Sequence, residues 1–549
     1  MTTNLDDSSW NKTDGLQLFG LLLLCAILTG MTLNIGGFWW TDESRHAMDG
    51  VYLYDVLRDL PFANLYQYTE EYFVRFPALG LTWYLPFFAF IESIVFNLFG
   101  ISEFSARLTV FLFALLGVWV WYLLAKNAWG RSVAFLSSLI LITHPIYMYW
   151  GRSVMLEVPL VTMMILAFAS FDGFLKSPTF KRSFIAGGAI FAMVLTKQTS
   201  LFLFPPLLIY ALFQRSFKTL FRKEAVPAYL LTVLALAVVY IHARKFGVNA
   251  FGGDNRAYDY QALFTVERWT MCARVIYQAY TLPVLLLAAT GILTIAVNKK
   301  RNAYDALILA WLVFWYLAIT IVTSAENNAL RYTTYLAPVV ALLASRFFFS
   351  VDSKKPIMGY VAYSTAVLAA IWNVVVLADN DQPYVDGYRK AAQFIHNHSV
   401  AAPVLFCCKH DGNFIFNLRV LDPERNHIVL RADKVMVSMA VHKHFGVKSY
   451  VENKNDILTV LDQYGVGYIV SEDHDLVGMK EFELLIETLK GDEFERVKSF
   501  AVDTNVDEFK NTNIHIYRYL QQKPIVNDEI VIPMPHLKRE IRLKLSDKK

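Results

Sequence analysis

Residues 104–125 read FSARLTVFLFALLGVWVWYLLA and are followed by KNAWGR at residues 126–131. The apolar run is long enough for a helix to cross a hydrocarbon core about 30 Å thick, because each helical residue adds about 1.5 Å. The basic residues that follow it are typical of a loop that stays on the cytoplasmic side of a membrane. Length and loop charge therefore predict a transmembrane helix and its direction.

Similar apolar runs recur through the first two thirds of the chain. Of the 549 residues, 55% are hydrophobic and only 18% are charged, whereas an average soluble protein is about a quarter charged. We expect an α-helical polytopic membrane protein with about eleven transmembrane helices, or as many as twelve or thirteen. The first run is too long for a signal-peptide core and predicts a retained helix. The expected spans are 15–38, 104–125, 132–149, 154–175, 183–196, 199–213, 225–243, 275–297, 303–323, 332–349 and 357–378.

Charge alternates between successive connections along the chain. The connections rich in Lys and Arg are predicted to be cytoplasmic; they are 126–131, 176–182, 215–224, 298–302 and 350–356. The intervening connections are then outside, together with the C-terminal part; they are 151–153, 197–198, 244–274 and 324–331. Segment 78–99 is long enough to cross, but a single crossing there would break this alternation. We interpret it as a re-entrant or interfacial segment; if it crosses, the N-terminus lies outside.

From about residue 380 the pattern becomes that of a soluble α/β domain. We expect a transmembrane catalytic domain at 1–379 with a first extracytoplasmic loop at 39–103, an extracytoplasmic α/β domain at 380–521 and a basic tail at 522–549. Within the tail, 538–549 is expected to be solvated. The expected helices are 387–398 and 456–464, and the expected strands are 404–408, 467–470, 494–501 and 514–519. The cysteines Cys407 and Cys408 are interpreted as packing residues, and the scattered histidines of this domain predict no metal site.

Three acidic residues are predicted near the outer membrane surface. Asp42 and Glu43 follow the first helix, and Glu157 lies close to the outer end of its own helix. Carboxylates at an interface are costly to desolvate unless they are used or paired, so these positions indicate a functional site. The alternative for Asp42 and Glu43 is an ordinary helix start, where acidic side chains are favourable.

Four cations are predicted on the same outer side, against the usual bias of membrane loops. They are Arg45, Arg75, Lys197 and Arg331. Arginine makes bidentate contacts to phosphate and lysine binds it as a point charge, although any one of these residues could simply extend toward lipid headgroups. Together with the acids, they suggest a pocket for a membrane-embedded phosphate.

Several short motifs follow one another in a fixed order. They are Asp42-Glu43-x-Arg45, Arg75-Phe76-Pro77, Glu103-Phe104-Ser105-Ala106-Arg107-Leu108, Gly151-Arg152 with Glu157-Val158-Pro159, Leu195-Thr196-Lys197, and Arg331-Tyr332 before Pro338. In these motifs, residues 16–378 resemble the polytopic glycosyltransferases of the GT-C superfamily, especially the branch of protein O-mannosyltransferases and the lipid A aminoarabinose transferase. The resemblance implies transfer of a hexosyl or pentosyl group from a polyprenyl phosphate to an acceptor outside the cytoplasm, with inversion at the anomeric carbon.

The resemblance also implies roles for individual residues. Asp42 would be the base, with Glu43 and Glu157 as further catalytic candidates and Arg152 in support. The implied ligands of the lipid phosphate are Arg45, Arg75, Lys197, Arg331 and Tyr332. Val74 stands where the aminoarabinose branch carries a metal-ligating Glu, so no metal is expected there, while a divalent cation elsewhere is left open. Glu157 stands where Asp is common, which keeps the charge and lengthens the side chain.

Two other kinds of protein could have this overall pattern. A transporter or flippase of lipid-linked sugars would place ionisable groups near the bilayer midplane and often shows repeated halves. Here the charges cluster at predicted helix ends and no repeat is visible. A noncatalytic scaffold or sensor is the third alternative. The expected partners are a polyprenyl-phosphate-linked sugar, a lipid, glycan or protein acceptor and membrane lipid, with no nucleic acid.

Overall fold

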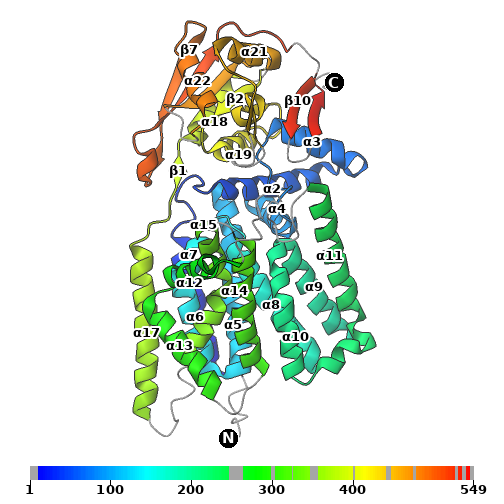
Figure 1. Ribbon diagram of the computed structural model, residues 1–549, viewed down its shortest axis with the longest axis vertical. Coiled ribbons are helices and arrows are strands. Elements are labelled where there is room, and N and C mark those ends of the chain that lie inside the picture. Colours follow the sequence, from blue (N-terminus) through cyan, green and yellow to red (C-terminus); the bar gives the residue numbers. More distant parts are fainter. Residues whose placement is uncertain are drawn as a thin grey trace.

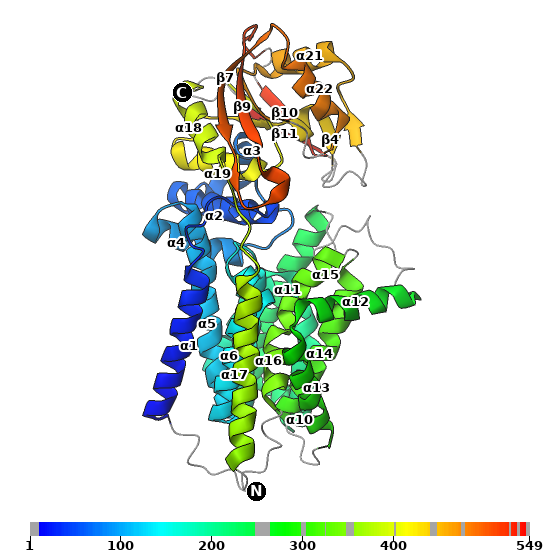
Figure 2. The same ribbon diagram turned by 90° about the vertical axis from the view of Figure 1, so that its left-hand side faces the viewer.

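The computed structural model describes residues 10–246, 264–297, 303–323, 326–346, 356–399, 402–439, 447–473, 478–525, 529–534 and 539–544. A bundle of long helices forms one half of the molecule, and an α/β domain caps one end of it (Figures 1 and 2). We call the capped end the domain end. The fold class predicted from the sequence is therefore confirmed.

Each predicted span contains a helix of the bundle. The bundle helices are α1 (Lys12–Gly30), α5 (Glu103–Trp129), α6 (Arg131–Thr143), α7 (Pro145–Gly151), α8 (Glu157–Lys176), α9 (Phe180–Thr196), α10 (Phe204–Phe213), α11 (Val226–Phe246), α13 (Leu282–Val297), α14 (Ala303–Val322), α16 (Ala337–Arg346) and α17 (Pro356–Ala378). Among the described residues, five helices are long and apolar enough to cross a membrane, or seven if two bent pairs each count as one span. The number of crossings stays a prediction.

Ion pairs show which helix ends lie together. At the end opposite the domain, Asp14 at the start of α1 binds Lys126 at 2.9 Å and Arg131 at 2.7 Å. Three consecutive bundle helices therefore meet there, as the alternation of basic connections predicts. The predicted connections 298–302 and 350–355 lie outside the described residues. The side of the membrane that each end faces stays a prediction.

The first loop forms a layer between the bundle and the α/β domain (Figure 2). It contains α2 (Thr41–Asp59), the short helix η2 (Phe62–Asn64), α3 (Leu65–Arg75) and α4 (Phe87–Phe99). The 13 residues of α4 would span only roughly 20 Å, which is too short for the hydrocarbon core. α4 packs against α2, and the interfacial interpretation of segment 78–99 stays a prediction.

The C-terminal domain is built on a five-stranded mixed sheet with the order β3-β2-β6-β9-β7. β2 (Val404–Cys407) is parallel to β3 (Val429–Arg431) and β6 (Tyr468–Glu472), whereas β9 (Asn513–Tyr519) is antiparallel to β6 and to β7 (Phe494–Ala501).

The predicted helices correspond to α18 (Tyr388–His398) and α21 (Lys454–Tyr464), and Cys407 and Cys408 are buried as packing residues. The remaining elements are β1 (Val385–Asp386), α19 (Asp411–Leu421), α20 (Ala432–Val435), β4 (Val437–Met439), β5 (Val447–Ser449), α22 (Lys480–Thr488) and β8 (Asp503–Thr504).

The prediction of a solvated basic tail is wrong for residues 539–544. These residues form β11 (Arg539–Lys544), which pairs with β10 (Glu529–Met534) as an antiparallel hairpin. Ile541 and Leu543 are buried between exposed charged neighbours, which is the alternation of a half-buried strand. Arg539 also binds Glu70 of α3 at 2.8 Å. The basic composition concealed a strand pattern, and residues 538 and 545–549 lie outside the described residues.

Helix α19 attaches the C-terminal domain to the first loop. Asn413 accepts a hydrogen bond from the Phe38 N–H at 3.2 Å and donates one to the Phe38 carbonyl at 2.7 Å. Gly412 lies so close to α2 that an added Cβ would be 2.0 Å from the Ser44 hydroxyl oxygen. A larger residue at position 412 would therefore push α19 away from α2.

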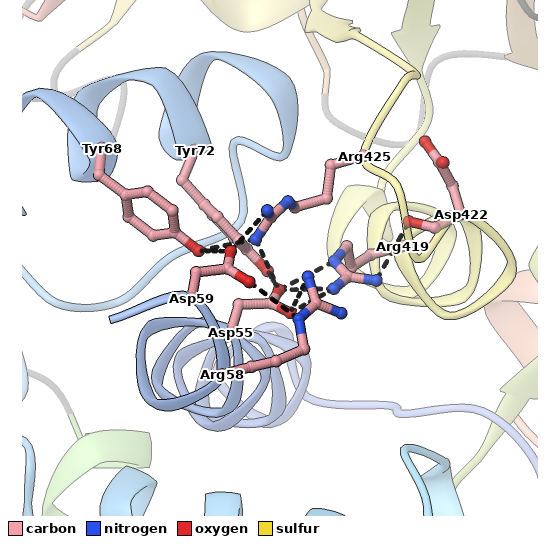
Figure 3. A network of polar contacts seen from close by, with 8 residues as sticks. All are labelled: Asp55, Arg58, Asp59, Tyr68, Tyr72, Arg419, Asp422 and Arg425. Carbon is pink, nitrogen blue, oxygen red and sulfur yellow. Dashed lines mark hydrogen bonds and ion pairs between the residues drawn. The ribbon is translucent and has the colours of Figure 1, made fainter. Parts of the chain in front are cut away.

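A buried ion-pair network strengthens this contact (Figure 3). The carboxylate of Asp55 in α2 is fully buried and lies 2.5 Å from the Arg419 guanidinium of α19. Tyr72 of α3 donates to the same carboxylate at 2.8 Å, and Arg425 binds Asp59 at 2.6 Å. Because a buried charge without a partner is costly, Asp55 and Arg419 each require the other.

Removing one member of this pair should destabilise the protein. We expect Arg419→Met to lower the free energy of unfolding by about 3–5 kcal/mol, because it leaves the Asp55 carboxylate buried without its main partner. The exposed pair Arg518–Glu495 provides a matched control, for which Arg518→Met should cost less than about 1 kcal/mol. Thermal unfolding and protease resistance of the detergent-solubilised protein measure both. Equal losses in the two variants would contradict a special role for Asp55–Arg419.

Candidate active site

The carboxylates of the adjacent residues Asp42 and Glu43 have different surroundings. Glu43 is 3% exposed, and its Oε2 accepts hydrogen bonds from the N–H groups of Trp39 and Trp40 at 3.1 and 3.0 Å. Its Oε1 accepts from the N–H of Val154 at 2.8 Å. Glu43 therefore caps the start of α2 and links it by a hydrogen bond to the segment before α8. Backbone donors occupy both of its oxygens, as the helix-start alternative predicts, and its catalytic role stays a prediction.

Asp42 belongs instead to a chain of charges at the domain end. Arg331 of α15 (Glu326–Tyr332) places Nη1 2.8 Å from Asp42 Oδ2 and Nε 3.1 Å from Glu157 Oε1. Lys197, at the end of α9, places Nζ 2.9 Å from the same Glu157 oxygen. The structure thus brings together four of the predicted site residues from four separate segments.

The charges lie in a largely apolar and aromatic environment. Glu157 and Lys197 are 0% and 5% exposed. Lys197 Nζ lies 4.6 Å from the centre of the Tyr332 ring, and the Tyr335 hydroxyl donates to Glu157 at 3.2 Å. Charges interact strongly where water is excluded, and aromatic faces favour nearby cations. The cluster can therefore hold an anion once the two cations turn from the carboxylates to an incoming group.

Asp42 is the acid of this cluster with the most access to solvent. Its side chain is 30% exposed, compared with 1% for Glu157. Desolvation raises the pKa of Asp42, but the charge of Arg331 and the hydrogen bond from its guanidinium outweigh that effect and hold the pKa well below its usual range. Asp42 is therefore ionised at neutral pH and can be reached by an acceptor molecule.

His46 and Tyr84 are part of this site and were not predicted from the sequence. His46 lies one turn after Asp42 on α2, and its ring centre is 4.3 Å from that of Tyr84. Burial lowers the pKa of His46 to about 4, so its ring is uncharged at neutral pH. The helical spacing of Asp42 and His46 could have indicated that they share a face of α2.

Three predicted cations have other partners. Arg45 binds Asp411 of the C-terminal domain at 3.1 Å, Arg75 donates to the Arg425 carbonyl at 3.2 Å, and Arg152 donates to the Leu28 carbonyl at 2.8 Å. The structure therefore brings Lys197 and Arg331 into the charge cluster, whereas the roles of Arg45 and Arg75 at a phosphate and of Arg152 in support stay predictions. Arg45 and Arg75 join the first loop to the C-terminal domain, and Arg152 joins two helices of the bundle.

Val74 does not fit the metal site that a glutamate would provide at this position. Its side chain is fully buried and belongs to the apolar core of the C-terminal domain. An aliphatic side chain has no lone pair to donate to a metal ion. Position 74 therefore provides no metal ligand.

Comparisons with known proteins place this geometry in context. The family described as dolichyl-phosphate-mannose-protein mannosyltransferase matches residues 85–243. A search of curated protein sequences gave no match. Among solved structures, the chain resembles ArnT from Cupriavidus metallidurans bound to undecaprenyl phosphate, with a TM-score of 0.58, 14% identity and coverage of 91% of this chain and 99% of ArnT.

Two further solved structures share the architecture. The archaeal oligosaccharyltransferase AglB from Archaeoglobus fulgidus, in complex with an inhibitory peptide and a dolichol-phosphate, matches with a TM-score of 0.53, 14% identity and coverage of 84% of this chain and 70% of AglB. The arabinofuranosyltransferase AftD from Mycobacteria matches with a TM-score of 0.54, 12% identity and coverage of 95% of this chain and 41% of AftD. The predicted resemblance is confirmed: the chain is a membrane protein with the fold of the GT-C superfamily of glycosyltransferases.

Proposed function

We propose that this protein transfers a sugar from a polyprenyl-phosphate carrier to an acceptor on the extracytoplasmic side of the membrane. The observation that carries the proposal is the position of Arg331, which bridges Asp42 and Glu157 beside Lys197. A potential base and two potential phosphate ligands are thereby adjacent at one end of the bundle. Two proteins of similar fold, ArnT and AglB, were solved with undecaprenyl phosphate and a dolichol-phosphate.

In the proposed reaction, an acceptor hydroxyl oxygen attacks the anomeric carbon of the lipid-linked sugar. The new carbon–oxygen bond forms on the face opposite the phosphate, so the anomeric centre is inverted. The bond between the anomeric carbon and the phosphate oxygen breaks, and its electron pair leaves with the lipid phosphate. Asp42 takes the proton of the acceptor hydroxyl, a contribution worth roughly 10²- to 10⁴-fold in rate for a positioned base.

Arg331 and Lys197 would stabilise the charge that develops on the departing phosphate. Cations placed in advance where charge appears often contribute more to the rate than the base does. Glu157 holds both cations in place before the donor binds, through its contacts at 3.1 and 2.9 Å. When Arg331 turns toward phosphate, its hold on Asp42 weakens and the carboxylate becomes a better base. Donor binding and activation of the base are thereby coupled.

A transporter of lipid-linked sugars is favoured less by this geometry. A transporter needs its ligand site to be reached from both membrane surfaces, near the bilayer midplane. The Asp42–Arg331–Glu157–Lys197 cluster lies instead at the ends of α2, α8, α9 and α15. Its position at one end of the bundle favours a transferase over a transporter.

The Asp42 assignment can be tested with purified protein in proteoliposomes. With a panel of undecaprenyl-phosphate sugars and hydroxyl acceptors, we expect wild-type protein to release undecaprenyl phosphate and form a glycosylated product, both visible by mass spectrometry. Asp42→Asn should lower kcat by roughly 10²- to 10⁴-fold because it removes the proton acceptor. Glu71→Gln, in the first loop but outside the cluster, is the control and should retain full activity. Full turnover by Asp42→Asn would refute the assignment.

The pH dependence of activity provides a second test. Because the pKa of Asp42 is depressed, its basic form persists as the pH falls, and kcat/KM should be constant between about pH 5 and 8. Arg331→Met removes the main positive charge beside Asp42 and should raise its pKa, so that the remaining activity decreases on the acid side. Lys197 forms its ion pair with Glu157, and Arg331 forms the ion pair with Asp42. Lys197→Met should therefore reduce activity without moving that acid limb. Identical pH profiles for Arg331→Met and wild type would contradict the coupling.

A further inference from the structure

Three consecutive side chains after Lys197 carry buried polar atoms that have no hydrogen-bond partner. Gln198, Thr199 and Ser200 begin the short helix η3 (Gln198–Leu203) and are 3%, 4% and 0% exposed. Among the described residues, Gln198 Oε1, Thr199 Oγ1 and Ser200 Oγ receive or donate no hydrogen bond. Such groups are uncommon in folded proteins because each lowers stability, so a run of three indicates a missing ligand. We call residues 198–200 the polar turn.

The polar turn adjoins residues on both sides of the charge cluster. Lys197 directly precedes it. Gln198 Nε2 donates to the Trp83 carbonyl at 3.4 Å, and the next residue, Tyr84, packs against His46 one turn from Asp42. Thr199 also lines a small cavity, whose other walls are Trp315, Ala318, Ile319, Tyr332 and Tyr335. A group bound by Lys197 would therefore have the polar turn as its neighbour.

The orientation of the Gln198 amide indicates the class of ligand. Only the amide nitrogen can donate to the Trp83 carbonyl, so the unpartnered atom is the oxygen, which only accepts hydrogen bonds. An ionised phosphate has no hydrogen to donate and cannot satisfy this atom. The hydroxyl or amino groups of a sugar can. The Thr199 and Ser200 hydroxyls both donate and accept, which suits several neighbouring sugar hydroxyls.

We propose that the polar turn binds the transferred sugar of the lipid-linked donor, by hydrogen bonds from the sugar to Gln198 and between the sugar and Thr199 and Ser200. The identity of the donor rests on the function proposed above. With the phosphate at Lys197 and Arg331, the sugar would lie between the phosphate and Asp42, where the anomeric carbon must be. The polar turn then selects among donors, because a site with buried polar groups discriminates against a sugar that leaves them unpaired.

The experiment compares bare carrier with sugar-linked carrier. Wild-type protein, Gln198→Met, Thr199→Val and Ser200→Ala are tested in nanodiscs for binding to undecaprenyl phosphate and to its mannose, glucose, galactose and arabinose derivatives. We expect each variant to keep its affinity for undecaprenyl phosphate within about twofold, and to lose roughly 10-fold in affinity for the sugar-linked lipid that wild type prefers. Without lipid, the Tm of Thr199→Val and of Ser200→Ala should be unchanged or higher, because an unpartnered polar atom has been removed. Gln198→Met also loses the hydrogen bond to the Trp83 carbonyl and is therefore judged by binding alone.

Ser138→Ala is the matched control. Ser138 on α6 also carries a fully buried hydroxyl with no partner among the described residues, but it is outside the polar turn. This variant should bind every lipid as wild type does.

Several outcomes would overturn the proposal. Equal losses for bare and sugar-linked carrier would assign the polar turn to phosphate. Unchanged binding of all lipids would assign the polar turn to an ordered water, whether or not the Tm falls. The proposal is also refuted if wild-type protein binds bare carrier but binds no sugar-linked lipid more tightly. Failure of wild type to bind even undecaprenyl phosphate would instead refute the proposed function itself.

Discussion

The bridge formed by Arg331 is the interaction on which the candidate site depends. One guanidinium lies within 3.1 Å of carboxylates from two different segments, and Lys197 completes the charge balance at Glu157. In a region with little water, none of these four charges is tolerated alone. The need to pair them brings α2, α8, α9 and α15 together. The same pairing keeps the site ready for an anion, since a phosphate can take the place of a carboxylate beside either cation.

The layer of the first loop makes this bridge possible by holding α2 across the end of the bundle. Glu43 attaches the start of α2 to the segment before α8, and the buried Asp55–Arg419 pair attaches its other end to the C-terminal domain. Asp42 is thus presented by a helix fixed at two points. The C-terminal domain therefore contributes to the site through the position of α2, although none of the residues described in that domain belongs to the charge cluster.

Part of the site could be predicted from the sequence, because the signal lies in the residues next to each site residue. Asp42, Glu157, Lys197 and Arg331 all stand at ends of apolar runs, and the alternation of basic connections assigns those ends to one face. That reasoning could not separate Arg45 and Arg75 from the cluster, because it assigns a side of the membrane and not a partner. Their partners, Asp411 and the Arg425 carbonyl, come from a domain that begins more than 300 residues later in the chain. His46 and Gln198 were not predicted as site residues, because a single histidine or glutamine has no sequence pattern of its own.

The sequence by itself determined that the chain is a bundle of membrane helices with a C-terminal α/β domain, since hydropathy and helical length are local properties that the bilayer selects directly. It also predicted that the charged helix ends share one face of the bundle. The tertiary structure alone decided which charges pair, that Glu43 serves the backbone while Asp42 stays accessible, and that the basic C-terminal residues form a strand. Those outcomes depend on distances of a few ångströms between segments far apart in the chain. Burial makes each such distance decisive, because a buried polar group must find its partner within hydrogen-bonding reach.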